Sequence, residues 1–126
     1  MTTQTVLIVE DGDDVEPLEI ALATLDGVKV VILASGLDAI NLLRIPSMDI
    51  AAVVTDLHLP HVDGFELIRA IRADRRHSRL PIVVVSGDCQ PDLPERLRVL
   101  GADAFFPKPY SPAEIRQLLK GLLYAS

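Results

Sequence analysis

The sequence predicts an α/β fold in which helices cover both faces of a five-stranded, doubly wound parallel sheet. Five short apolar runs, mostly β-branched, alternate with segments in which apolar residues recur every three or four positions. The first pattern is typical of buried strands and the second of amphipathic helices. Several of the apolar runs also end abruptly in a carboxylate or hydroxyl side chain. The alternation of strands and helices predicts parallel pairing of the strands with right-handed crossovers.

The first half of the chain contains two strand-helix units. Residues 5–9 form a β-branched strand that ends in acidic residues, and apolar positions from Asp14 onward mark a helix with Gly27 at its C-terminal cap. Residues 29–33 form the second strand. The helix that follows opens at Ser35 and stops before Pro46.

The third strand is the apolar run of residues 51–56, which ends at Asp56 and is followed by Leu59-Pro60 and Asp63-Gly64 turn signals. A helix then carries Phe65, Ile68 and Ile71 on one face.

Residues 81–86 and 104–106 are the last two strands. Between them, Asp92 to Glu95 has the form of a capping box for a helix of about two turns that ends at Gly101. The final helix is expected to be capped at Ser111 and to carry Ile115, Leu118, Leu119 and Leu122.

Five strands in a doubly wound sheet predict the flavodoxin-like order 2-1-3-4-5, which places the ends of the first and third strands side by side. Glu10, Asp11 and Asp56 are therefore expected to converge. Because clustered carboxylates repel one another unless a cation is bound, these oxygen ligands predict a Mg²⁺ site. Ser86 and Lys108 follow the fourth and fifth strands toward the same rim, and the set of groups suits a phosphoryl group held on an oxygen nucleophile.

These motifs resemble, over essentially the whole chain, the receiver domain of bacterial two-component response regulators, in particular single-domain chemotaxis-type regulators. Ser86 follows Asp56 by 30 residues and Lys108 follows Ser86 by 22, separations that the family shares. The matching motifs are Val9-Glu10-Asp11, Thr55-Asp56-Leu57 through Asp63-Gly64, Val85-Ser86-Gly87, and Gly101-Ala102-Asp103 through Lys108-Pro109.

The resemblance implies a role for each of these residues. Asp56 would accept the phosphoryl group, with Ser86 and Lys108 binding phosphoryl oxygens. Mg²⁺ would be held by Asp11, Asp56 and the backbone carbonyl of His58, with Glu10 acting through water. Phe105 would hold the switch position together with Ser86, although plain core packing is the alternative for this ring. The Lys108-Pro109 peptide bond is expected to be cis.

Three features depart from the family pattern or remain open. Phe105 lacks a hydroxyl group, so switching there would work by burial of the ring. His58 and Asp88, each two residues beyond a key site residue, occupy positions that tune hydrolysis of the aspartyl phosphate in the family. A run of basic side chains has two interpretations, a docking surface for an acidic partner or a solvated helix end: Arg69, Arg72, Arg75, Arg76 and Arg79.

Composition restricts the class of protein. The 126 residues fit one domain, so we expect residues 1–126 to form a single receiver domain. The net charge of −6 opposes direct DNA binding, which depends on Lys and Arg contacts with phosphates. No apolar stretch is long enough for a membrane span, there is no signal-peptide pattern, and Cys89 stands alone. We therefore expect a cytoplasmic protein without membrane partners.

Three functional hypotheses follow. The first is a phosphorylation switch, not a turnover enzyme, that receives its phosphoryl group from a sensor histidine kinase or phosphotransfer protein. It would signal to a downstream protein through the face formed by the fourth helix, fifth strand and fifth helix. The second is an aspartyl-phosphate phosphatase or transferase of the haloacid dehalogenase type, which wants an Asp where this chain has His58. The third is an interaction module that is not phosphorylated, for which four clustered polar groups would serve no purpose.

Overall fold

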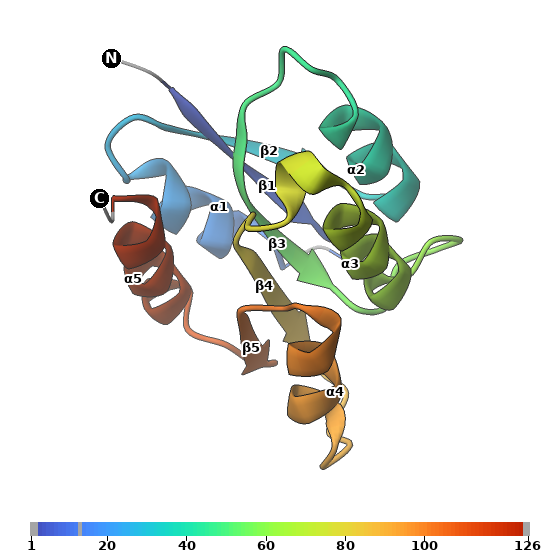
Figure 1. Cartoon of the computed structure of the whole chain (residues 1–126). Coiled ribbons are helices and arrows are strands. Elements are labelled where there is room, and N and C mark those ends of the chain that lie inside the picture. Colours follow the sequence, from blue (N-terminus) through green and yellow to red (C-terminus); the bar gives the residue numbers. More distant parts are fainter. Residues whose placement is uncertain (1–2, 13, 125–126) are drawn as a thin grey trace.

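The computed structural model describes residues 3–12 and 14–124. Its centre is a five-stranded parallel sheet in the order β2-β1-β3-β4-β5, as predicted (Figure 1). None of the helices in the described residues is long and apolar enough to cross a membrane. The strands are β1 (Gln4–Val9), β2 (Val28–Leu33), β3 (Ile50–Asp56), β4 (Ile82–Ser86) and β5 (Ala104–Pro107).

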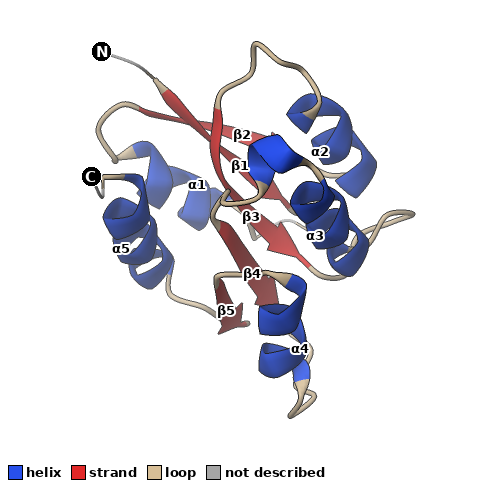
Figure 2. Ribbon diagram, in the orientation of Figure 1, coloured by secondary structure: helices blue, strands red, loops and turns tan. Residues whose placement is uncertain are grey.

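Helices connect consecutive strands and lie on both faces of the sheet (Figure 2). Helices α1 and α5 cover one face, and α2, α3 and α4 cover the other. The bounds are α1 (Glu16–Ala23), α2 (Gly36–Leu43), α3 (Gly64–Ala73), the short 3-10 helix η1 (Arg75–His77), α4 (Leu93–Leu100) and α5 (Pro112–Leu123).

Alternating side chains of each central strand supply two separate hydrophobic clusters. In β1, Val6 and Ile8 pack with α1 and α5, whereas Leu7 and Val9 pack with the helices on the opposite face. The strands are apolar on both faces because both faces are covered, which explains their continuous hydrophobic runs in the sequence. The polar residues at the strand ends are thereby confined to one edge of the sheet.

Local end signals account for several helix boundaries. The Ser35 hydroxyl accepts a hydrogen bond from Asp38 N at the start of α2, and the Ser111 hydroxyl accepts one from Glu114 N at the start of α5. Gly101 ends α4 with φ of 112°, a left-handed conformation that favours glycine. These three predictions are confirmed.

Two predicted helix ends were wrong. Asp92 precedes α4, but it has helical φ and ψ angles and its side chain makes no capping hydrogen bond. A capping box requires an extended residue there, because only then does the side chain turn back toward the first free N–H groups. Helix α1 ends at Thr24 rather than near Gly27, because the Thr24 hydroxyl and N–H both donate to the carbonyl of Ala21.

Arg72 is part of the run of basic residues, but it is neither a docking residue for an acidic partner nor a solvated helix end. Its Nε and Nη2 donate to the carbonyl oxygen of Gly101 at 3.0 and 2.8 Å, and its Nη1 donates to the carbonyl of His77 at 2.9 Å. Nη2 also lies 3.2 Å from Asp103 Oδ2, which accepts a hydrogen bond from Ile82 N. The Arg72 guanidinium therefore joins α3 to the C-terminal end of α4 and to the starts of β4 and β5.

Candidate functional site

The carboxyl ends of four strands bring the predicted polar residues to one edge of the sheet. Asp56 and Ser86 are the last residues of β3 and β4, while Glu10 and Lys108 directly follow β1 and β5. Lys108 N donates to the carbonyl of Ser86 at 2.8 Å, which continues the pairing of β4 and β5 and aims the lysine toward β3. The peptide bond between Lys108 and Pro109 is cis, as predicted.

Asp56 is a buried carboxylate, with 5% of the residue exposed. Its Oδ1 accepts a hydrogen bond from the backbone N–H of His58 at 3.1 Å. Its Oδ2 lies 2.7 Å from the ammonium nitrogen of Lys108. Both oxygens are thus held in place by donors from the chain, and the carboxylate is oriented at the strand end.

Gly64 allows the loop after β3 to fold back against Asp56. A Cβ atom on this residue would lie 2.5 Å from the Asp56 carbonyl oxygen and 2.7 Å from Leu57 Cα. Gly64 N also donates to the carbonyl of Leu57 at 2.9 Å. The Asp63-Gly64 turn signal therefore marks a position where only glycine fits, because the backbone passes too close for a side chain.

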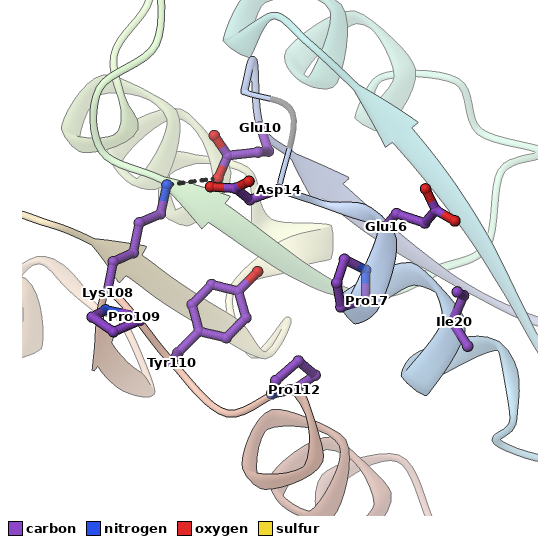
Figure 3. Close-up of a pocket in the computed structure, with 9 residues that line it drawn as sticks. All are labelled: Glu10, Asp14, Glu16, Pro17, Ile20, Lys108, Pro109, Tyr110 and Pro112. Carbon is purple, nitrogen blue, oxygen red and sulfur yellow. Dashed lines mark hydrogen bonds and ion pairs between the residues drawn. The ribbon is translucent and has the colours of Figure 1, made fainter.

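Lys108 is shared between two carboxylates. Its Nζ lies 3.0 Å from Glu10 Oε2 in addition to its contact with Asp56, and Figure 3 shows it reaching from the connection after β5 toward Glu10. The second Glu10 oxygen, Oε1, accepts a hydrogen bond from Gly12 N at 3.2 Å. One cation therefore faces two buried anions, and at full ionisation a negative charge remains.

The pKa values in this cluster shift in different directions. Burial raises the pKa of Glu10 more than its hydrogen bond with Lys108 lowers it, and the nearby charge of Asp56 raises it further. Burial also acts to raise the pKa of Asp56, but hydrogen bonds from Lys108 and from the His58 N–H lower it below its usual value. The pKa of Lys108 is raised despite its burial, because both carboxylates stabilise the ammonium. Asp56 is consequently the carboxylate that stays ionised most readily.

Asp11 is exposed in the loop after β1. Among residues 3–12 and 14–124, no three His, Cys, Asp or Glu side chains form a group that could hold a metal ion. Glu10 and Asp56 therefore meet as predicted, but they do not form a three-carboxylate cluster with Asp11. Lys108 contacts both buried carboxylates and offsets part of their charge.

Ser86 and Phe105 lie on the adjacent strands β4 and β5. Ser86 is fully buried, and its hydroxyl oxygen accepts a hydrogen bond from Asp88 N at 3.0 Å. Phe105 is half-buried and packs against the hydrophobic cluster beneath α2, α3 and α4. At the outer rim, His58 Nε2 lies 4.0 Å from Asp88 Oδ2, with 70% of the His58 side chain exposed.

An open cleft of about 1010 Å³ lies beside Glu10 and Lys108, between α1 and the segment that leads into α5 (Figure 3). Tyr110 lines this cleft, and burial together with the charge of Glu10 raises the pKa of its phenol. The exposed side chain of Ile20 lies at the same cleft. Sequence patterns did not single out these two residues. In the sequence, the position of Tyr110 two residues after Lys108 could have indicated that this side chain lies near the site.

Comparison with known proteins identifies the family. Residues 6–120 match the family described as the response regulator receiver domain. The chain belongs to this family. The polar residues at the strand ends, described above, thus lie in a receiver domain.

Relatives cover the receiver domain almost completely. It is 29% identical over 121 residues to the polar-differentiation response regulator DivK of Brucella ovis, covering 96% of this chain and 97% of DivK. The receiver domain of the sensor histidine kinase PA1611 of Pseudomonas aeruginosa superimposes with a TM-score of 0.81 at 28% identity, covering 97% and 98% of the two chains. That crystal structure has a magnesium ion coordinated in its active-site cleft.

A third comparison is a response regulator receiver protein from Pseudomonas putida, with a TM-score of 0.82 at 30% identity, covering 94% of this receiver domain and 97% of that chain. Family membership implies phosphorylation-dependent signalling in a two-component system. The chain is accordingly a signalling protein rather than an enzyme that turns over a separate substrate.

Proposed function

We propose that this receiver domain is a phosphorylation switch in which Asp56 accepts a phosphoryl group from a histidine kinase or phosphotransfer protein. The observation that carries the proposal is the position of Asp56, buried at the end of β3 with Oδ2 2.7 Å from the Lys108 ammonium. The lowered pKa of Asp56, which results from the Lys108 and His58 hydrogen bonds outweighing burial, keeps the carboxylate ionised. An ionised carboxylate is a nucleophile that needs no general base.

The reaction transfers a phosphoryl group from an imidazole nitrogen of the donor protein to a carboxylate oxygen of Asp56. A carboxylate oxygen of Asp56 forms a bond to phosphorus, and the bond from phosphorus to the donor's imidazole nitrogen breaks, with its electron pair leaving on the imidazole. Lys108 provides a fixed positive charge for the phosphoryl oxygens, and the Ser86 hydroxyl provides a hydrogen-bond donor. Catalysis of this kind depends on positioning and charge stabilisation.

A Mg²⁺ ion held by two carboxylates, a backbone carbonyl and water does not require a cluster of three carboxylates. All the available donors are oxygens, the ligand type that Mg²⁺ prefers, and Lys108 alone leaves the two buried carboxylates with excess negative charge. Asp11, Asp56 and the His58 backbone carbonyl would hold the ion, with Glu10 acting through water. When bound, Mg²⁺ supplies positive charge that offsets the charge of the phosphoryl oxygens.

The surfaces around the site suit contacts with two kinds of protein partner, a phosphodonor protein and a downstream target. The cleft of about 1010 Å³ beside Lys108 gives a phosphodonor protein access to the strand ends, and the exposed Ile20 provides apolar contact there. Output would pass through the face formed by α4, β5 and α5, with Ser86 and Phe105 as the switch residues. We treat residues 1–126 as one receiver domain, because a single sheet joins strands from Gln4 to Pro107.

Intact-mass measurement tests the proposal. After incubation with acetyl phosphate and Mg²⁺, we expect the wild-type protein to gain one phosphoryl group and the Asp56→Asn variant to gain none. Asp26→Asn, which removes an exposed carboxylate outside the cleft, is the matched control and should behave as wild type. Equal phosphorylation of wild type and Asp56→Asn would exclude Asp56 as the acceptor.

A further inference from the structure

A groove lies between α3 and α4, on the face of the sheet opposite α1 and α5 (Figure 1). Its volume is about 320 Å³, and it is lined by Phe65, Arg69, Glu95, Arg96, Val99 and Leu100. The first two of these residues belong to α3 and the other four to α4. Both walls of this α3–α4 groove are therefore helical, and none of the lining residues belongs to a strand.

The floor of the α3–α4 groove is apolar. Phe65 and Leu100 are half-buried and pack against the hydrophobic cluster beneath α2, α3 and α4. Val99, beside Leu100 on α4, is 72% exposed. A single exposed apolar side chain is ordinary on a protein surface, but this one lines the same groove as two others. The groove thus offers apolar area that a partner can remove from water.

Two arginines at the α3–α4 groove have no carboxylate partner in the described part of the chain. The ion pairs that arginines make there are those of Arg72, Arg76 and Arg98. Arg69 and Arg96, which both line the groove, are exposed and stand outside these pairs. Each therefore keeps a positive charge that an acidic group from outside the chain can approach.

Arg96 is held in position for such a contact. Its Cζ lies 5.2 Å from the centroid of the Phe65 ring, and its Nη1 donates to Gln90 Oε1 at 3.1 Å. Within residues 3–12 and 14–124, Nη1 is the nitrogen of this guanidinium that has a hydrogen-bond acceptor. The Nε and Nη2 donors remain for a carboxylate, which an arginine binds best through two parallel hydrogen bonds.

Glu95, the acidic residue of the lining, does not cancel these charges. Both of its carboxylate oxygens accept hydrogen bonds from Arg98, one from Nε and one from Nη2. This pairing lowers the pKa of Glu95 and offsets its charge. The wider region has the same balance, since residues 64–100 contain seven arginines and five acidic residues, whereas the whole chain carries a net charge of −6.

A contact between the two helices sets the width of the α3–α4 groove. The Arg72 guanidinium, on α3, donates through Nε and Nη2 to the carbonyl oxygen of Gly101, directly after α4. Only 18% of the Arg72 side chain is exposed. The helices are therefore joined beside Leu100, and the groove exists before any partner arrives. A preformed site binds at a lower cost in ordering than one that has to be assembled.

We propose that the α3–α4 groove docks an acidic amphipathic helix of a partner protein. The apolar face of that helix would lie on Val99 and Leu100, and its carboxylates would pair with Arg69 and Arg96. A helix suits the site because an extended peptide needs an open strand edge, whereas an amphipathic helix lays its apolar face into a groove of side chains. The inference does not rest on the proposed function, because none of the lining residues lies at the strand-end site.

An acidic protein segment fits this surface better than a nucleic acid does. Nucleic acids gain affinity from a row of contacts between cations and successive phosphates. The α3–α4 groove offers two unpaired cations beside an apolar floor, which matches a helix that carries both carboxylates and apolar side chains.

A synthetic peptide serves as the probe. It has about 15 residues, the length at which isolated helices begin to be stable, with Leu at every third or fourth position and Glu beside them. Fluorescence anisotropy measures its affinity for the full chain without phosphodonor, and amide shifts locate its site. We expect saturable binding that moves the signals of Phe65, Arg69, Arg96 and Val99.

Substitutions in the α3–α4 groove should weaken binding of this peptide. Val99→Asp should lower the affinity about tenfold, because it replaces an apolar contact with a charge that repels the probe. Arg69→Ala should lower it about threefold, as expected for an exposed ion pair. Leu37→Asp changes an exposed apolar residue on α2, and Arg75→Ala removes an exposed arginine of the same basic run outside the groove. Both controls should bind as the wild type does.

Four outcomes would overturn the proposal. They are absence of saturable binding, shifts that lie outside α3 and α4, equal affinity in Val99→Asp, and equal affinity for a peptide with Ser in place of Leu. Tighter binding of oligothymidylate at the same residues would make the groove a nucleic-acid surface instead. Groove signals that move with protein concentration, without peptide, would make the occupant a second copy of this chain. Each result leaves the phosphorylation of Asp56, measured by intact mass, to stand or fall separately.

Discussion

The ammonium nitrogen of Lys108 lies 2.7 Å from Asp56 Oδ2 although the two residues are 52 positions apart in the chain. The same nitrogen contacts Glu10, so the charge of one lysine stabilises two buried carboxylates. Removing this lysine leaves two anions side by side without a cation. The ionisation of the site should therefore depend on Lys108 more than on any net charge of the protein.

Lys108→Ala should raise the pKa of Asp56. In the wild-type protein, burial acts to raise this pKa, and the hydrogen bond from Lys108 is the largest effect that lowers it. Without the ammonium, the effect of burial dominates and the pKa of Asp56 rises. Carboxyl ¹³C shifts followed over pH in wild type and Lys108→Ala measure the change. Lys120→Ala, an exposed lysine on α5, is the control, and an unchanged Asp56 titration in Lys108→Ala would contradict the assignment.

Glu10→Gln should change how stability depends on pH. The pKa of Glu10 in the folded protein lies above its ordinary value of 4.5, chiefly because of burial. The folded protein therefore binds this proton more tightly than the unfolded chain, and the free energy of unfolding falls as pH rises from 4.5 through the folded pKa. Asp56, with a lowered pKa, acts in the opposite sense: its stabilisation is present above 3.8 and is lost as pH falls through the folded pKa.

Urea denaturation without Mg²⁺ at about pH 4 to 8 measures the Glu10 effect. The fall in stability above pH 4.5 should be present in the wild type and absent in Glu10→Gln. Glu16→Gln, an exposed residue at the same cleft, is the control and should keep the wild-type profile. Parallel profiles for wild type and Glu10→Gln would show that Glu10 is not the group responsible.

Asp11→Ala should weaken Mg²⁺ binding by about tenfold or more, because even groups that only support metal ligands are worth that much. The measurement is a Mg²⁺ titration followed by backbone amide shifts near Asp56. Asp14→Ala removes another exposed carboxylate that lines the cleft, and it should have a smaller effect. Equal Mg²⁺ affinity in wild type and Asp11→Ala would remove Asp11 from the site.

Ser86→Ala should still accept a phosphoryl group but respond weakly to it. The nucleophile and Lys108 remain, whereas the hydroxyl that would follow the phosphoryl oxygens is lost. Loss of the acceptor for Asp88 N should also cost about 1 kcal/mol of stability. Intact mass measures phosphorylation of the variant, and amide shifts over Leu93 to Phe106 measure its conformational response. A full set of shifts in the phosphorylated variant would exclude Ser86 as the switch residue.

Gly101→Ala should destabilise the protein, whereas Gly121→Ala should stabilise it. A left-handed conformation costs a residue with a Cβ atom about 1–2 kcal/mol, and the new Cβ would lie 2.9 Å from Arg72 Nε. A Cβ on Gly121, within α5, would meet nothing within 4 Å, and alanine gains about 0.5–1 kcal/mol there. Urea denaturation of both variants measures the change in the free energy of unfolding, which should have opposite signs in the two. A neutral Gly101→Ala would contradict the left-handed conformation and the close approach of Arg72 at this position.

The sequence alone predicted the strands, the helices and their order. Short apolar runs, helical periodicity and turn residues act over a few positions, so Ser35, Ser111 and Gly101 marked helix ends correctly. The position of Glu10, Asp56, Ser86 and Lys108 at one edge also followed from sequence, because parallel strands all end on the same side of a sheet.

The contacts between these residues were decided by the tertiary structure. Pairing of Lys108 with both Glu10 and Asp56, exposure of Asp11, and the anchoring of Gly101 by Arg72 do not appear in any local pattern. Asp92 is a further example, because the sequence favours a helix cap at this position but the helical backbone angles of Asp92 prevent it. Local patterns determine which segments are buried, but the direction of a polar side chain depends on the charges and backbone groups that packing brings next to it.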